Sequence, residues 1–169
     1  MIQWIYYPRS DKPTLMALKV VEAFKAVADE IDSSLYVKQH SDEVLSKVAY
    51  HLSQVGFLVE KGKKLVQKIY VPVLFGLNGK PEKSFDADAY HLKEHFVVEV
   101  EAGRGVTNYQ FLKDLFQACM MHDVFYLAIA IRNIYRSSKD FEKVNKFFDT
   151  LYASNRLQLP LKGILLIGY

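Results

Sequence analysis

The chain has 169 residues, of which 50% are apolar and 24% charged, and its net charge is +3; this fits one globular domain and neither requires nor excludes a nucleic-acid partner. The single cysteine, Cys119, excludes an internal disulfide and a zinc site built from cysteines, and favours a reducing, cytoplasmic location. No apolar run is long enough to span a membrane, and the N-terminus lacks a signal-peptide pattern, so we expect a soluble, unprocessed protein with no membrane partner.

Two amphipathic helices are predicted first in the chain. Apolar residues recur at three- and four-residue spacing over residues 14–31 and again over residues 42–55. Ser41 is a candidate N-cap for the second helix, and Gly56 is a candidate C-terminal glycine. We expect residues 1–40 to form a helical extension packed on a single domain that spans the whole chain.

Short β-type segments follow these helices. They are rich in β-branched and aromatic residues and are separated by turn residues. The segments are "FLVEKG", "QKIYVPVLFG", "SFDADAY" and "HFVVEVEA". This pattern predicts a meander of three or four antiparallel strands.

The helical period returns after Gly105. In "TNYQFLKDLFQACMMHD" a capping box is formed by Thr107 and Gln110, and one apolar face is shared by Phe111, Leu112, Leu115, Phe116 and Cys119. The apolar run "VFYLAIAI" is typical of a strand buried on both faces. A helix from about Ser138 and a final strand, "GILLIGY", complete an α/β fold with a mixed sheet.

Four carboxylates lie on two of the predicted strands. Residues two apart on a strand share a face, so Asp86 is paired with Asp88, and Glu99 with Glu101. If these strands are neighbours, at least three carboxylates converge and raise one another's pKa, which favours a bound cation. Oxygen ligands of this kind suit Mg²⁺, for which Mn²⁺ can substitute. For Asp86 alone, an ordinary solvent-exposed acid is the favoured interpretation.

Two basic clusters are candidates for a phosphate-facing surface. One comprises Lys61, Lys63, Lys64 and Lys68, and the other comprises Arg132, Arg136, Lys139 and Lys143. Such clusters are more often a solvated face, and the sequence leaves both interpretations open.

An aspartate on the second core strand, followed by Glu-x-Glu on the third, resembles the PD-(D/E)XK nuclease superfamily, whose fold is called restriction endonuclease-like. The resemblance covers roughly residues 41–131 and includes the order helix, three strands, helix, strand. The matching residues are Asp88, Glu99 and Glu101, with Glu101 standing where the family usually has lysine. No proline precedes the aspartate in "FDAD", so either Asp86 or Asp88 could be the metal ligand.

The resemblance implies a mixed central sheet, an antiparallel meander plus a parallel strand, flanked by helices. It also implies Mg²⁺-dependent hydrolysis of phosphodiester bonds, with DNA as the expected substrate. Asp88, Glu99 and the Val100 carbonyl would hold the metal, and Glu101 would assist. The nucleic-acid backbone would contact Arg104, Lys61, Lys63 and Lys64.

The sequence leaves a second function open. The same fold could carry a catalytically silent nucleic-acid-binding or protein-assembly module. A homodimer would suit cleavage of two strands, but no sequence feature indicates one. From the helical spacing we expect Lys113 and Gln110 to point away from the site.

Overall fold

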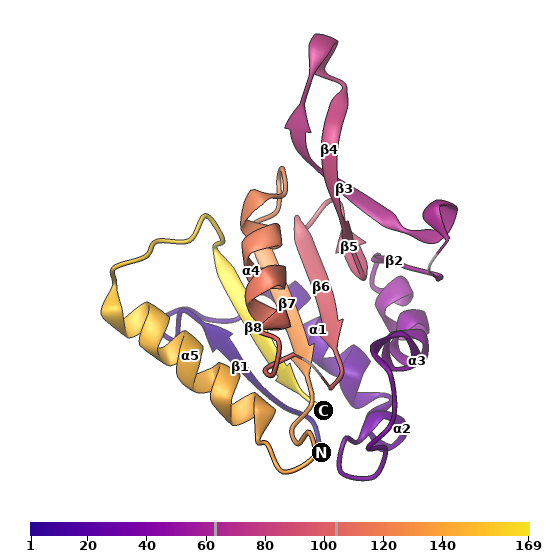
Figure 1. The fold of residues 1–169 in the computed structure, drawn as a ribbon, viewed down its shortest axis with the longest axis vertical. Coiled ribbons are helices and arrows are strands. Elements are labelled where there is room, and N and C mark those ends of the chain that lie inside the picture. The colour runs from indigo at the N-terminus through magenta and orange to yellow at the C-terminus, as the bar shows by residue number, and fades with distance from the viewer. Residues whose placement is uncertain (63, 104) are drawn as a thin grey trace.

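A computed structural model describes residues 1–62, 64–103 and 105–169. Within them, a central sheet has the strand order β1-β8-β7-β6-β5-β2, and β3 and β4 form a separate two-stranded sheet. Helices cover both faces of the central sheet (Figure 1). The predicted α/β class with a mixed, helix-flanked sheet is therefore confirmed. No helix in these three ranges has the length and apolar character needed to cross a membrane.

The parallel part of the sheet lies at its centre. Strands β6 (Phe96–Glu101), β7 (Tyr126–Ile131) and β8 (Gly163–Gly168) run parallel, with β7 in the middle. The crossover helices are α4 (Gln110–Met120) and α5 (Asp140–Ser154). The apolar β7 is buried from Leu127 to Ile131, as its sequence predicted.

The N-terminal 40 residues contribute a strand as well as helices. Strand β1 (Gln3–Tyr7) pairs antiparallel with β8 at the edge of the central sheet. The helix expected over residues 14–31 is divided into α1 (Leu15–Lys25) and α2 (Ala28–Ile31). Thr14 caps α1, because its hydroxyl accepts a hydrogen bond from the Ala17 N–H.

The third helix begins one residue earlier than expected. Helix α3 (Ser41–Gln54) has His40 rather than Ser41 as its N-cap. Gly56 follows its C-terminus with a φ of +100°, a left-handed conformation that glycine adopts without steric cost.

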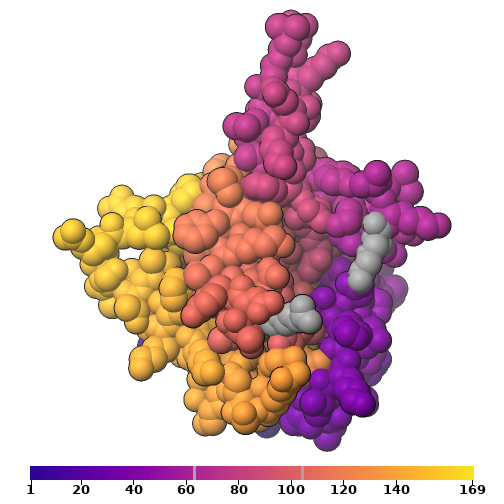
Figure 2. All heavy atoms as spheres, in the orientation of Figure 1, coloured from indigo at the N-terminus to yellow at the C-terminus, as the bar shows by residue number. Residues whose placement is uncertain are grey.

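The expected antiparallel meander is split into two parts. Strands β2 (Leu58–Val59) and β5 (Ala89–His91) join β6 in the central sheet. Strands β3 (Ile69–Phe75) and β4 (Pro81–Ala87) instead form an arm that projects from the body of the molecule (Figures 1 and 2). Pro72 lacks a backbone N–H, so β3 is unsuited to the interior of a sheet.

The core has one layer on each face of the central sheet. Helices α1 and α3 pack against one face, and α4 and α5 pack against the other. Strand β6 divides its side chains between them: Phe96, Val98 and Val100 face the first layer, and Val97 faces the second. The prediction that Phe116 lies on the buried face of α4 is wrong, since this side chain is 51% exposed.

Candidate functional site

The candidate site lies where the chain leaves the arm and enters the central sheet. Asp88 occupies the single position between β4 and β5. Because Ala89 pairs with Val98 in the antiparallel β5–β6 ladder, Asp88 lies opposite Glu99. The main chain of Asp88 is also fixed on its other side, where its carbonyl accepts a 2.8 Å hydrogen bond from the Glu60 N–H. The predicted adjacency of the two acidic strands is confirmed.

The Asp88 side chain binds the backbone of the neighbouring strand. Its Oδ2 accepts a 2.7 Å hydrogen bond from the Val100 N–H. If β5 continued by two residues toward the N-terminus, Ala87 would lie opposite Val100 and could accept this hydrogen bond. Ala87 belongs to the arm instead. The N–H and C=O of one strand residue point toward the same neighbour, so the Val100 carbonyl faces the Asp88 side of β6 as well.

Glu99 and Glu101 point to the face of the sheet that α4 covers. They alternate with Val98 and Val100, which pack in the opposite layer. Both glutamates are partly buried. Helix α4 places a further acid against them, Asp114, which is only 4% exposed.

Asp114 was not foreseen from the sequence. Its carboxyl group shares a hydrogen bond with Glu101, and this requires a proton on one of the two groups. Its Oδ2 has no hydrogen-bond partner within the described ranges. Asp114 lies three residues after Phe111 and four before Ala118, both buried. The sequence signal that could have identified Asp114 is its helical spacing, which places this acid on the same face as two buried apolar residues.

Burial raises the pKa of every carboxyl group in this cluster. It raises the pKa of Asp88 to about 7, with smaller contributions from the negative charges of Glu60, Glu101 and Asp42. Burial raises the pKa of Asp114 to about 8, and the charge of Glu101 adds to the effect. The same desolvation places the pKa of Glu99 well above its ordinary value, and nearby Asp88 and Asp114 raise it further. The cluster therefore favours a positive partner when ionised.

Two further acids, Asp42 and Glu60, raise the pKa of Asp88 and were not predicted as part of the site. Asp42 is in the first turn of α3, and Glu60 directly follows β2. An acid in the first turn of a helix is ordinary, because it complements the helix dipole, so the sequence contained no special signal at Asp42.

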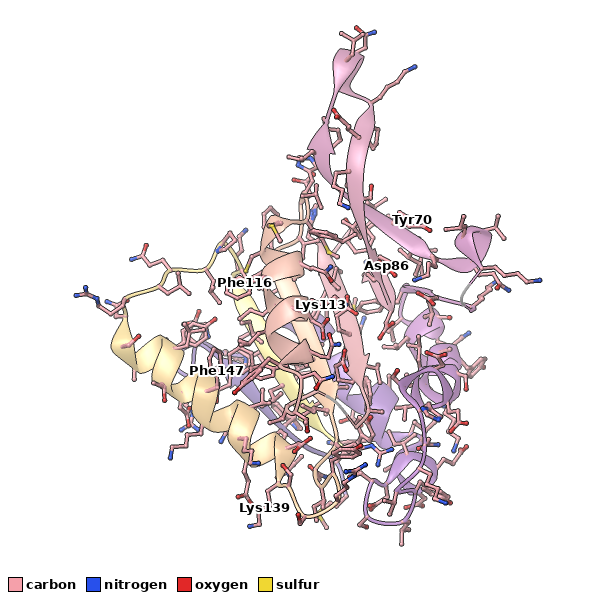
Figure 3. All side chains as sticks on the ribbon, in the orientation of Figure 1. Tyr70, Asp86, Lys113, Phe116, Lys139 and Phe147 are labelled. Atoms are coloured by element: carbon pink, nitrogen blue, oxygen red, sulfur yellow. The ribbon has the colours of Figure 1, made fainter. Side chains whose placement is uncertain are left out.

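Lys113 lies on the rim of the cluster. It projects from the side of α4 nearer to β6, and Phe116 projects from the other side (Figure 3). Its charge lowers the pKa of both Glu99 and Glu101. Lys113 is exposed, as expected, and forms no ion pair among the described residues, but it is closer to the site than the helical spacing indicated.

Gln110 lines a pocket together with Glu101 and Lys113, so it lies closer to Glu101 than the helical spacing indicated. The expected capping box is absent, because α4 begins at Gln110 and its N-cap is Tyr109, in a left-handed conformation.

Asp86 is separate from the cluster. It lies on β4 in the arm, with its side chain 48% exposed, and it forms an ion pair with Lys68. This hydrogen-bonded ammonium holds the pKa of Asp86 below its ordinary value. Of the two aspartates left open by the sequence, Asp88 is the one beside Glu99.

The basic clusters are only partly surface features. Lys61 and Lys64 are exposed after β2, whereas Lys63 and Arg104 lie outside the described residues. Arg132 is buried, at 2% exposed, and its guanidinium donates hydrogen bonds to the carbonyls of Val37 and Gln39. The interpretation of Arg132 as a solvated surface charge is wrong.

Comparisons with known proteins add no constraint. No protein-family model, curated protein or solved structure matches the chain. The chemistry of the site must therefore be inferred from its own side chains.

The donor atoms of the site suit a hard cation. In residues 1–62, 64–103 and 105–169, no three Asp, Glu, His or Cys side chains are grouped closely enough to hold a metal ion. Mg²⁺, however, is commonly held by one or two carboxylates, with water and substrate phosphate completing its shell. Asp88, Glu99 and the Val100 carbonyl provide oxygen donors of that type on one side of β6.

Proposed function

We propose that the protein is a metal-dependent nuclease that hydrolyses phosphodiester bonds, with DNA as its expected substrate. One observation carries the proposal: Asp88, at the junction of β4 and β5, lies opposite Glu99 of β6, in surroundings that raise the pKa of both carboxyl groups. Carboxylates that are buried to this extent are costly to ionise, and function is a common reason to retain them.

The arrangement of elements supports the finer fold assignment. Helix α3, strands β2, β5 and β6, helix α4 and strand β7 follow the order of the restriction endonuclease-like fold that the sequence resembles. The β5–β6 pair is antiparallel and the β6–β7 pair is parallel, as that fold requires. The arm is then an insertion between the first two core strands.

Each residue of the site has a proposed role. Asp88, Glu99 and the Val100 carbonyl would hold Mg²⁺ or Mn²⁺. When bound, the metal would lower the pKa of a coordinated water and neutralise charge on the scissile phosphate. The hydrogen bond from Val100 keeps the Asp88 carboxylate in place. Glu101 takes the position of the usual lysine. Its carboxylate accepts a hydrogen bond from the protonated Asp114, and it would orient a water molecule.

Positive side chains outside the cluster would bind the nucleic-acid backbone. Lys61 and Lys64 are exposed beside β2, near the Glu60–Asp88 hydrogen bond. We propose the same role for Lys63 and Arg104. Phosphate contacts of this kind position a strand without reading its sequence.

The test is cleavage of plasmid, linear double-stranded and single-stranded DNA, and RNA, with Mg²⁺, Mn²⁺ or EDTA. The wild type is expected to cut DNA only when a divalent cation is present. Glu99→Gln keeps the side-chain shape and removes a charge, so it should abolish cleavage and leave salt-sensitive nucleic-acid binding intact. Salt-sensitive binding with no cleavage of any of these substrates would instead favour the silent binding module.

A further inference from the structure

A pocket of about 760 Å³ opens beside Glu101 at the carboxyl end of β6. Glu101 is the last residue of β6, and Arg132 directly follows the parallel strand β7. In sheets of this type, ligands bind outside the carboxyl ends of parallel strands. The acidic and basic side chains that line the pocket are Lys38, His40, Glu101, Lys113, Arg132 and Arg136.

The pocket is strongly cationic. Among its described lining residues, Glu101 is the one acid. Lys38, Lys113, Arg132 and Arg136 form no ion pair with a carboxylate in the described part of the chain. Positive charges gathered in a partly enclosed space attract an anion more strongly than dispersed surface charges do.

Arg132 gives the pocket a fixed, buried charge. Its hydrogen-bond partners, the carbonyls of Val37 and Gln39, are neutral, and its Nε has no partner among the described residues. Burial raises the pKa of the Asp140 carboxyl and the charge of Arg132 lowers it, but the two groups form no ion pair in the described part of the chain. The buried guanidinium is therefore only partly compensated, and an anion in the pocket would offset the remaining cost.

Arg136 extends this charge to the pocket surface. The guanidinium groups of Arg132 and Arg136 lie 5.7 Å and 5.3 Å from the ring centroid of Tyr135, which also lines the pocket. These cation–π contacts help to orient both arginine side chains. Arginine in such a place presents a planar set of donors that matches phosphate oxygens.

We propose that this pocket binds a phosphate group, and that in the intact complex it is a phosphate of the nucleic-acid strand next to the one that is cleaved. The assignment of that phosphate to a nucleic acid rests on the proposed function. The phosphate-binding chemistry does not, because it follows from the cationic lining. The pocket would hold the nucleic-acid strand beside Glu101. This contact would position the substrate and would not require a bound metal.

The test is binding of pyrophosphate and of a single-stranded DNA oligonucleotide of about eight nucleotides, measured in EDTA by calorimetry and by fluorescence anisotropy. Lys38→Gln/Arg136→Gln changes exposed side chains of the pocket. Lys19→Gln/Arg156→Gln removes the same charge from exposed positions outside it. The pocket variant should bind both ligands at least about tenfold more weakly, and the control should change less than about twofold.

Wild-type protein that binds neither ligand, or equal losses in both double variants, would overturn the phosphate pocket. An Asp88→Asn variant separates this result from the proposed function. It should lose metal-dependent cleavage and keep pyrophosphate binding. If the wild type cleaves DNA but Lys38→Gln/Arg136→Gln binds both ligands as tightly as the wild type does, the phosphate-pocket proposal is rejected and the nuclease proposal stands. If the wild type cleaves no substrate, and pyrophosphate binding is lost in Lys38→Gln/Arg136→Gln but not in the control, the phosphate-pocket proposal is supported and the nuclease proposal is rejected.

Discussion

The Val100 N–H donates a 2.7 Å hydrogen bond to Oδ2 of Asp88, across the point where the chain passes from the arm into the central sheet. A side chain thus replaces the missing main-chain partner of β6. The bond holds the Asp88 carboxylate opposite Glu99.

This bond predicts different outcomes for two substitutions of Asp88. Asp88→Asn keeps a side-chain oxygen for the Val100 N–H and removes the charge, so stability in EDTA should be unchanged or higher. Asp88→Ala leaves that buried N–H without a partner and should cost about 1–3 kcal/mol. Urea unfolding of both variants at neutral pH measures the difference. Equal stability of the two variants would show that the bond contributes little.

Asp114 predicts a pH dependence of stability. Burial raises its pKa to about 8, so the folded protein binds a proton that the unfolded chain, with a pKa of about 4, releases. The stabilisation is therefore complete below the unfolded pKa and is lost as pH rises through the folded pKa. Asp114→Asn should flatten the fall in unfolding free energy between about pH 6 and about pH 9.

Asp86→Asn is the control for that experiment. Asp86 is exposed and its pKa is below the ordinary value, so this group is ionised in both states throughout the measured range. Its replacement should shift stability without changing the slope. A slope that survives Asp114→Asn would place the titrating proton elsewhere in the cluster.

Lys113 is expected to tune the carboxylates. Its charge lowers the pKa of Glu99 and Glu101, so Lys113→Gln should raise both values. Mg²⁺ competes with protons for these oxygens, and its stabilising effect should then begin at a higher pH. Melting curves with Mg²⁺ or EDTA across a pH series measure this shift. Lys113→Arg keeps the charge and should retain the wild-type profile; a shift of equal size in that variant would argue against an electrostatic role.

Much of the central fold could be predicted from the sequence. Helix α3 and strand β7 are long, regular patterns, and the short connection between β5 and β6 leaves room only for antiparallel pairing. Strand β1 was missed because its five residues, "QWIYY", do not alternate in polarity. The residues that it pairs with in β8 are far away in the chain, from 157 residues (Tyr7 and Ile164) to 165 residues (Gln3 and Gly168), so the pairing is not a local property.

Only part of the candidate site was predicted, because local patterns do not determine how distant segments pack together. Alternation along β6 correctly placed Glu99 and Glu101 on one face. The position of Asp114 depends on the packing of α4 against that face, which the spacing of its apolar residues alone did not determine. Arg132 was misassigned because its partners, the carbonyls of Val37 and Gln39, come from a loop far away in the sequence.

The central claim is that Asp88 and Glu99 form a divalent-cation site. The most direct measurement is calorimetric titration of Mn²⁺ into the wild type and into Glu99→Gln at about pH 8, which is above the raised pKa of Asp88. We predict saturable binding to the wild type, at least about tenfold weaker binding to Glu99→Gln, and a cation-dependent rise in the melting temperature of the wild type. Absence of binding to the wild type, or equal affinity in both proteins, would contradict the account and leave these acids as a buried charged cluster of another purpose.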